Sequence, residues 1–222
     1  MGRVMEYSGM LSREDLNKAF DKRFSTEFRR AVGSARVAIA GLGGLGSNVA
    51  MMLARSGVGH LLLVDFDTVD VTNLNRQAYG VTHIGQLKTN AMPEILRGIA
   101  PYMEINTWQG RVTPDNVKEI FSDYRIIVEA FDDPEQKSML VDSVLTQCPD
   151  AIVVSGNGMA GFGNSNAIQT VKYSDRLYIC GDQKTGSGEG IGLTAPRVSI
   201  CAGHEANKVI ELIAEMNGIE VN

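Results

Sequence analysis

The sequence contains little cysteine, few aromatic residues and no long apolar run. Its three cysteines, at positions 148, 180 and 201, are an odd number and include no Cys-x-x-Cys pair. This pattern excludes a disulfide-stabilised small protein and predicts that no structural zinc is bound through paired cysteines. No stretch reaches the ~18 apolar residues of a membrane span, and no apolar signal core follows the first residues. We therefore expect a cytoplasmic protein with no membrane partner.

A strong excess of charge of either sign is also missing. The 222 residues carry 21 lysines and arginines against 26 aspartates and glutamates, a formal net charge of −5. Proteins that grip nucleic acid by its phosphates usually present a broad basic surface. The composition therefore argues against a nucleic-acid partner. With 44% hydrophobic residues, a chain of this length can bury a sizeable core.

Apolar periodicity alternates along the chain between spacings typical of buried strands and of helices. Strand-like runs occupy residues 36–40, 60–65, 104–108, 125–129 and 151–154, and helix-like segments occupy 48–56, 86–99, 114–121 and 134–147. The alternation predicts an α/β fold with a Rossmann-like, doubly wound and mainly parallel sheet. Residues 166–173 and 176–180 flank a Ser-Asp turn, which predicts an antiparallel hairpin at one end of the sheet.

The two ends of the chain and one glycine-rich segment complete the predicted organisation. One amphipathic helix is expected over residues 12–33, and a final helix begins at Pro196 and stops before Asn217. Residues 181–193 include the run GDQKTGSGEGIG, whose glycine content predicts a mobile loop. Because no repeat or long linker is visible, we expect a single domain over residues 1–222.

The clearest motif is a glycine turn between the first predicted strand and the helix after it. Gly41, Gly43 and Gly46 match Gly-x-Gly-x-x-Gly, and Asp65 ends the next strand. Such glycines let the backbone approach a phosphate at a helix N-terminus, while the acid can accept hydrogen bonds from ribose hydroxyls. Tight helix–sheet packing alone would account for the glycines but not for the acid. The context predicts nucleotide binding.

Charged residues at the same predicted edge of the sheet indicate which nucleotide is bound. Arg76 and Lys88 follow the acidic strand end, and Asp132 and Asp133 follow the strand RIIVEA, whose carboxyl end shares that edge. Cations can neutralise charge on phosphates, and a carboxylate can hold a metal ion. We therefore predict binding of ATP with Mg²⁺, catalytic roles for Arg76, Lys88 and Asp132, and a metal-associated role for Asp132.

Four motifs occur in order: GLGGLGSNVA at 41–50, LLLVDFDTVDVTNLNRQ at 61–77, GQLK at 85–88 and VEAFDD at 128–133. Together they resemble the ubiquitin-activating-enzyme superfamily, in particular its bacterial thiamine-biosynthesis (ThiF) and molybdopterin-biosynthesis adenylyltransferase branches, over about residues 12–215. The resemblance implies a homodimeric nucleotidyltransferase that uses Mg-ATP to adenylate the C-terminal glycine of a small ubiquitin-like sulfur carrier ending in Gly-Gly. It also implies a place in thiamine biosynthesis and a cysteine-derived sulfur donor protein as a partner.

The resemblance also implies which residues form the site. The positions expected to bind the nucleotide are Gly41, Gly43, Gly44, Gly46, Asp65, Asp67, Thr72, Asn73, Arg76, Gln77, Lys88 and Asp133. Arg23 is the candidate for an N-terminal arginine that reaches the ATP of the partner subunit. The family's metal-associated aspartate matches Asp132, with Asp133 as the alternative. Some members form a covalent bond through a cysteine, for which Cys180 is the candidate here, although a lone cysteine is more often a small buried hydrophobe.

Other functions fit part of the same pattern. An NAD-dependent oxidoreductase would also use the glycine turn and Asp65. A non-catalytic module could keep the fold and grip a ubiquitin-like partner without turnover. A third possibility within the superfamily is a dehydratase that activates a modified tRNA adenosine, against which the acidic composition counts.

Overall fold

The computed structural model describes residues 12–186 and 192–220. Within these residues, seven strands form one sheet in the order β3-β2-β1-β4-β5-β7-β6. The strands are β1 (Arg36–Ala40), β2 (His60–Asp65), β3 (Glu104–Gln109), β4 (Ile126–Glu129), β5 (Ile152–Gly156), β6 (Gln169–Ser174) and β7 (Leu177–Gly181). All neighbours are parallel except the antiparallel pair β6–β7. The predicted α/β sheet with a hairpin at one end is confirmed.

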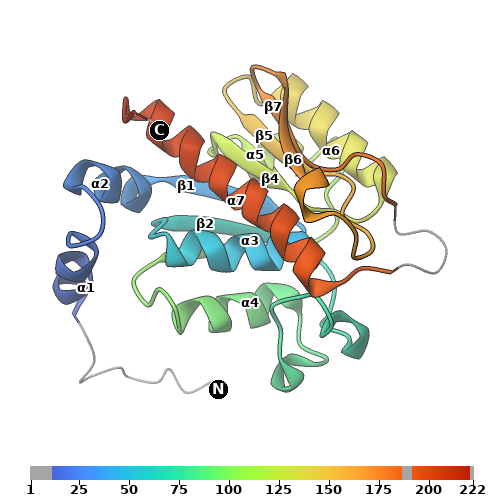
Figure 1. The fold of residues 1–222 in the computed structure, drawn as a ribbon, viewed down its shortest axis with the longest axis horizontal. Helices are drawn as coiled ribbons and strands as arrows, with labels where there is room; N and C mark the ends of the chain where they lie inside the picture. Colours follow the sequence, from blue (N-terminus) through green and yellow to red (C-terminus); the bar gives the residue numbers. More distant parts are fainter. Residues whose placement is uncertain (1–11, 187–191, 221–222) are drawn as a thin grey trace.

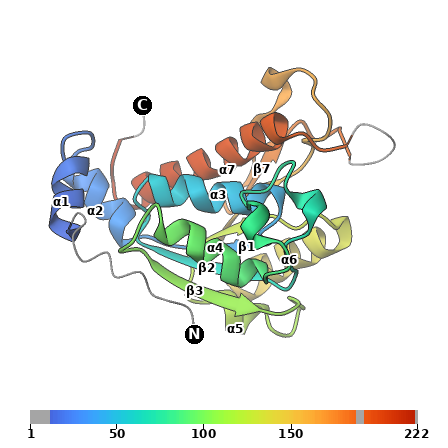
Figure 2. The same ribbon diagram turned by 90° about the horizontal axis from the view of Figure 1, so that it is seen from below.

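Helices cover both faces of this sheet (Figures 1 and 2). They are α1 (Arg13–Phe20), α2 (Thr26–Ser34), α3 (Gly44–Arg55), α4 (Lys88–Arg97), α5 (Val117–Phe121), α6 (Pro134–Gln147) and α7 (Ala195–Met216). In the part of the chain that the structure describes, three short 3-10 helices lie in the connections, namely η1 (Val71–Asn73), η2 (Val81–His83) and η3 (Ser165–Ala167). No helix in the two described ranges is long and apolar enough to cross a membrane.

Alternate residues of the central strands enter two separate hydrophobic clusters. Val37 and Ile39 of β1 pack with α2, α3, α4 and α7 on one face. Ala38 and Ala40 pack with α5 and α6 on the other face. This double coverage explains why the central strands are apolar at nearly every position instead of alternating with polar residues. It also leaves the carboxyl ends of the strands as the edge where polar side chains gather.

The structure differs from the single helix predicted over residues 12–33. α1 ends at Phe20, and α2 begins after Ser25, which has an extended backbone and accepts a hydrogen bond from the Phe28 amide at 3.1 Å. Phe24 contacts the rings of both Phe20 and Phe28 across the break. The apolar spacing therefore reflects a shared cluster of aromatic rings, while the serine N-cap divides the segment into two helices.

Two smaller differences concern the glycine-rich segments. The helix predicted from residue 48 begins already at Gly44, because the glycine turn itself forms the first helical turn with Gly43 as its N-cap. Gly181, predicted as the start of a loop, is the last residue of β7. Residues 187–191 of the loop predicted at 181–193 lie outside the described residues.

Candidate nucleotide-binding site

The glycine turn lies between the carboxyl end of β1 and the first turn of α3. Gly41 has a φ of +94°, and a Cβ atom there would lie 2.7 Å from the Ala130 carbonyl oxygen just beyond β4. A Cβ atom at Gly46 would lie 1.8 Å from the Gly41 carbonyl oxygen. Both positions therefore require glycine, because any side chain would separate the turn from β4 or from α3. Gly43, the N-cap of α3, and Gly44, its first residue, carry no side chain of their own.

Asp65 at the end of β2 holds this turn in place. Its two carboxylate oxygens accept hydrogen bonds from the backbone amides of Leu42, at 2.6 Å, and Asp67, at 2.7 Å. Burial raises the pKa of Asp65, while Lys88 and the two amides act in the opposite direction. Each oxygen of an ionised carboxylate can accept more than one hydrogen bond. Asp65 can therefore brace the turn and still accept from a ribose hydroxyl.

Lys88 lies beside the two acids at the end of β2. It is the first residue of α4, and its side chain is only 6% exposed. Its Nζ atom is 2.9 Å from Asp67 Oδ2 and 4.0 Å from Asp65 Oδ2. In this arrangement Lys88 compensates the negative charge at the end of β2, and its role at the phosphates of a bound nucleotide stays a prediction.

Arg76 lies next to the N-terminus of α3. Its Cγ and Cδ atoms are 3.5 and 3.7 Å from the position that a Cβ atom would take at Gly44. Its Nη1 atom donates to the Thr72 carbonyl at 3.1 Å and to Asn75 Oδ1 at 2.9 Å. The Nδ2 group of Asn48 donates to the carbonyl oxygens of both Gly44 and Arg76 and joins the two segments. The guanidinium and the helix N-terminus thus present positive charge in one place.

An unsatisfied acceptor lies beside the turn. The Oε1 atom of Gln77 is buried and has no hydrogen-bond partner among the described residues. Its Nε2 atom is 3.9 Å from the position that a Cβ atom would take at Gly43. Buried polar atoms in native proteins are nearly always hydrogen-bonded, so an orphan acceptor indicates a missing donor. Gln77 and the bare glycine backbone fit a ligand that carries both hydroxyl or amino donors and an anionic group.

The N-terminus of α7 also lies beside Gly44 at the start of α3. The sequence did not predict this arrangement. A Cβ atom at Gly44 would lie 3.2 Å from Val198 Cγ1 in the first turns of α7. Asn75 Nδ2 also donates to the Leu193 carbonyl oxygen at 3.1 Å. The N-terminal ends of α3 and α7 therefore lie close together (Figure 1). Arg76 contacts the first residue of α3 at this point. Two helix N-termini at one point favour an anion there.

The two candidate acids after β4 have different surroundings. Asp132 and Asp133 are both exposed, but Asp133 caps α6 by accepting a hydrogen bond from the Gln136 amide at 2.9 Å. The ring of Phe131, directly before them, has its Cδ1 atom 3.1 Å from the position of a Cβ atom at Gly41. The described residues contain no group of three or more His, Cys, Asp or Glu side chains able to hold a metal. Mg²⁺ in nucleotide sites usually takes one or two carboxylates together with phosphates, so Asp132 beside the turn fits it.

Three other predicted residues lie in η1 and between α1 and α2. The Thr72 amide and hydroxyl both donate to Asp70 Oδ1, and Asn73 Oδ1 accepts from the Asp70 amide, so these side chains cap η1. Arg23 is exposed between α1 and α2. Because α2 leads into the amino end of β1 and the glycine turn follows its carboxyl end, Arg23 lies at the opposite edge of the sheet from the turn of its own chain.

Polar residues that the sequence analysis missed tie this region together. Ser47 Oγ donates to the Gly43 carbonyl at 2.6 Å and accepts from the Ala78 amide at 3.1 Å. The buried Tyr79 hydroxyl donates to the Leu42 carbonyl at 2.9 Å. Together with Asn48, these residues attach segment 76–79 to the glycine turn. The sequence signal for these contacts is slight. It consists of the polar pair Ser47-Asn48, which follows the glycine motif in the first turn of α3.

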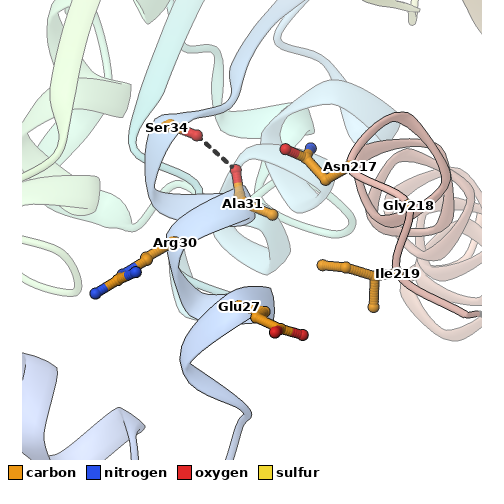
Figure 3. A pocket seen from close by; sticks show the side chains of 7 residues that line it. All are labelled: Glu27, Arg30, Ala31, Ser34, Asn217, Gly218 and Ile219. Atoms are coloured by element: carbon orange, nitrogen blue, oxygen red, sulfur yellow. Dashed lines mark hydrogen bonds between the residues drawn. The ribbon is translucent and has the colours of Figure 1, made fainter.

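A separate cavity of about 470 Å³ lies between α2 and the end of α7 (Figure 3). Its lining residues are Glu27, Arg30, Ala31, Ser34, Asn217, Gly218 and Ile219. Ser34 marks the amino end of β1, so the cavity lies at the edge of the sheet opposite the glycine turn. It contains none of the residues predicted to bind the nucleotide.

The three cysteines are all buried and free. Burial raises the pKa of Cys180 to about 12, and burial likewise raises the pKa of Cys201, whose Sγ donates to the Cys180 carbonyl. Thiolate is the reactive form, so we expect the native protein to leave all three thiols essentially unmodified by Ellman's reagent in mildly alkaline buffer. Unfolding in guanidinium should release three reactive thiols per chain. Rapid modification of Cys180 in the native protein would contradict this arrangement.

Three relatives found by sequence similarity are named adenylyltransferases. The chain is 33% identical to the adenylyltransferase and sulfurtransferase uba4 of Pyricularia oryzae over 82% of its own length, but it spans only 39% of that protein. It spans 30% of the corresponding protein of Candida glabrata. With the molybdopterin-synthase adenylyltransferase of Salmonella typhimurium it shares 28% identity over 86% of its own length and 78% of that relative.

Solved structures share the fold at lower identity. The tRNA N6-threonylcarbamoyladenosine dehydratase of E. coli in complex with AMP matches with a TM-score of 0.82 and 21% identity, covering 94% of this chain and 99% of that one. E. coli MccB with ATP matches with a TM-score of 0.67 and 22% identity, covering 85% and 58%. The sequence model of the ThiF family matches residues 16–221. The chain therefore belongs to the ThiF family.

Proposed function

We propose that this protein is a nucleotidyltransferase that uses ATP to adenylate the C-terminal glycine carboxylate of a small ubiquitin-like sulfur carrier. The observation that carries the proposal is the position of Arg76 against Gly44, where the N-termini of α3 and α7 converge. Asp65 lies at the opposite end of the same turn. The names of the adenylyltransferase relatives support this reaction class.

Some residues of the site would bind the nucleotide, and others would stabilise charge during the reaction. Asp65 would accept from the ribose hydroxyls, and the free amides at the start of α3 would face the phosphates. Arg76 would stabilise negative charge that develops at the α-phosphate, and Lys88 would offset the negative charge of Asp65 and Asp67 beside it. Mg²⁺, held by Asp132, would supply further neutralisation of phosphate charge.

The proposed reaction needs no nucleophile from the protein. A carboxylate oxygen of the carrier attacks the α-phosphorus of ATP and forms the acyl-phosphate bond. The bond between the α-phosphorus and its bridging oxygen breaks, and pyrophosphate leaves with those electrons. Positioning and electrostatic stabilisation supply the catalysis, which agrees with the burial of all three thiols.

Finer parts of the proposal rest on the family resemblance and on composition. We propose a carrier of thiamine biosynthesis, a cysteine-derived sulfur donor protein, a homodimer in which Arg23 reaches the partner's ATP, a single domain and a cytoplasmic location. The names of the relatives support adenylation in general and leave the pathway open. Arg23 suits a role in trans because it lies far from the turn of its own chain.

ATP–pyrophosphate exchange with a cognate carrier tests the site. Arg76→Ala and Asp132→Asn should each lower the exchange rate by about a hundredfold or more, the usual cost of removing a group that stabilises transition-state charge. Arg97→Ala, which removes an exposed arginine at the end of α4, is the matched control and should exchange at the wild-type rate. Undiminished exchange in both site variants would refute the assignment.

Ligand-binding and pyrophosphate-release measurements on the wild-type protein distinguish the alternative functions. An oxidoreductase would bind NADH and not ATP, and a non-catalytic module would bind the carrier without releasing pyrophosphate. A dehydratase acting on tRNA would release pyrophosphate with tRNA and not with a carrier. The likeness to the E. coli dehydratase is one of fold at 21% identity, so the substrate-dependence of pyrophosphate release decides between carrier and tRNA.

A further inference from the structure

A largely buried ion pair flanks the loop that carries Asp132. Glu129, the last residue of β4, is fully buried, and its Oε2 atom is 2.8 Å from Nζ of Lys137 in α6. The same Oε2 atom accepts a hydrogen bond at 2.6 Å from Ser155 Oγ on the neighbouring strand β5. The pair therefore joins β4, β5 and α6 at the carboxyl edge of the sheet.

The two members of this pair also hold the backbone of Phe131. Glu129 Oε1 accepts a hydrogen bond from the Phe131 amide at 2.8 Å. Lys137 Nζ donates to the Phe131 carbonyl oxygen at 3.0 Å. That carbonyl belongs to the peptide group that joins Phe131 to Asp132. Because Asp133 caps α6, Asp132 stands between two residues whose positions are set by hydrogen bonds.

Stability alone gives little reason for a buried ion pair at this position. Taking an ion pair out of water is costly, and apolar residues of similar volume often replace such pairs without loss of stability. An ion pair can, however, fix the orientation of a backbone segment, because its carboxylate can accept from a backbone amide while its ammonium group donates to a backbone carbonyl. Both sides of Phe131 are bonded in this way, and its ring also packs against Gly41 of the nucleotide turn.

We propose that Lys137, through its ion pair with Glu129, is a positioning residue that orients Asp132 toward the metal of a bound nucleotide. The inference rests on the proposed function, because it assigns Asp132 to Mg²⁺. Residues that orient metal ligands typically change metal affinity by about tenfold to a hundredfold when they are removed.

Binding of ATP to the full-length protein, measured by calorimetry with Mg²⁺ and with EDTA, provides the test. We expect Lys137→Met to raise the Mg²⁺ concentration that gives half of the metal-dependent gain in ATP affinity by about tenfold or more. ATP affinity in EDTA should stay at the wild-type value, and Lys137→Arg should restore most of the metal dependence. Hydrogen exchange at the Phe131 amide of the ligand-free protein should be faster in Lys137→Met.

A double variant tests whether Lys137 acts through Asp132. Adding Lys137→Met to Asp132→Asn should cause no further loss of metal dependence. Lys208→Met is the control, because it removes another largely buried, ion-paired lysine at a distance, on α7. If Lys137→Met does not fold, Glu129→Gln combined with Lys137→Met leaves no unpaired buried charge and replaces it in the comparison.

The outcomes distinguish a failure of the positioning role of Lys137 from a failure of the proposed function. Wild-type metal dependence in the folded Lys137 variant, or additive losses in the double variant, would overturn the positioning role and leave the proposed function standing. Absence of ATP binding by the wild-type protein in both buffers would instead refute the proposed function, and the positioning role with it.

Discussion

Replacing Gly46 with alanine is expected to abolish measurable ATP binding. The new Cβ atom would lie 1.8 Å from the Gly41 carbonyl oxygen and 3.1 Å from Ile39 Cγ2, so α3 must move away from the turn. Such overpacking also destabilises the fold by about 1–3 kcal/mol. Calorimetric titration with ATP, together with urea unfolding, measures both effects.

Two other glycines separate loss of binding from loss of stability. A Cβ atom at Gly59 would lie 1.8 Å from the Gly33 carbonyl oxygen, which is an equally severe clash away from the nucleotide turn. Gly59→Ala should therefore destabilise the protein while its folded fraction still binds ATP. Gly33→Ala meets nothing within 4 Å on α2 and should be neutral or slightly stabilising. Normal ATP affinity in Gly46→Ala would contradict the packing described for the turn.

Replacing Glu205 with glutamine is expected to stabilise the protein at neutral pH. Glu205 lies on α7 with no exposed surface, and neither carboxylate oxygen has a hydrogen-bond partner among the described residues. Burial raises the pKa of Glu205 well above 4.5; Lys137 lowers it, and the charge of Glu129 raises it further. Glutamine has nearly the shape of the protonated acid and needs no proton, so the comparison isolates the cost of keeping the carboxyl group neutral.

The sign of the pH dependence follows from the raised pKa. Above pH 4.5 the unfolded chain releases the Glu205 proton while the folded chain retains it, so the stability contributed by this group falls as pH rises toward the folded-state pKa. The loss amounts to about 1.4 kcal/mol for each pH unit of that window. Glu205→Gln should therefore gain stability over wild type by this amount per pH unit, and the two proteins should converge below pH 4.5.

Urea unfolding across this pH range measures the effect. Glu215→Gln on the same helix is the control, because its side chain is 49% exposed and pairs only weakly with Lys208. Its stability should follow the wild-type pH profile. A Glu205→Gln variant with the wild-type profile would show that Glu205 is ionised in the folded protein.

The sheet and the glycine turn could be predicted because their signals are local. Apolar runs such as 36–40 and 60–65 are covered on both faces, and that coverage is visible as uninterrupted hydrophobicity. Gly41 and Gly46 face backbone at distances that admit no side chain. A glycine motif that matches these positions therefore predicts close backbone contacts at the turn. The family resemblance drew on these same segments.

The division of the first helix could not be predicted as readily. The apolar spacing of Phe20, Phe24 and Phe28 suits one helix, but Ser25 bonds the Phe28 amide and starts a second one. Phe24, between the two helices, still contacts the rings of Phe20 and Phe28 across the break. An N-cap such as Ser25 changes the free energy of a helix by only a small amount, and the spacing of apolar residues does not report that contribution.

The sequence by itself determined the α/β sheet, the nucleotide turn and the acid that ends the second strand, since each depends on neighbouring residues. Only the tertiary structure decided how distant polar groups are paired. It placed Lys88 against two acids, left Gln77 with an unsatisfied oxygen, and brought the N-terminus of α7 beside α3. It also placed Lys137 and Glu129 on the two sides of the Phe131 backbone. These contacts depend on how strands, helices and the loops between them pack together, so the periodicity of a single segment could not reveal them.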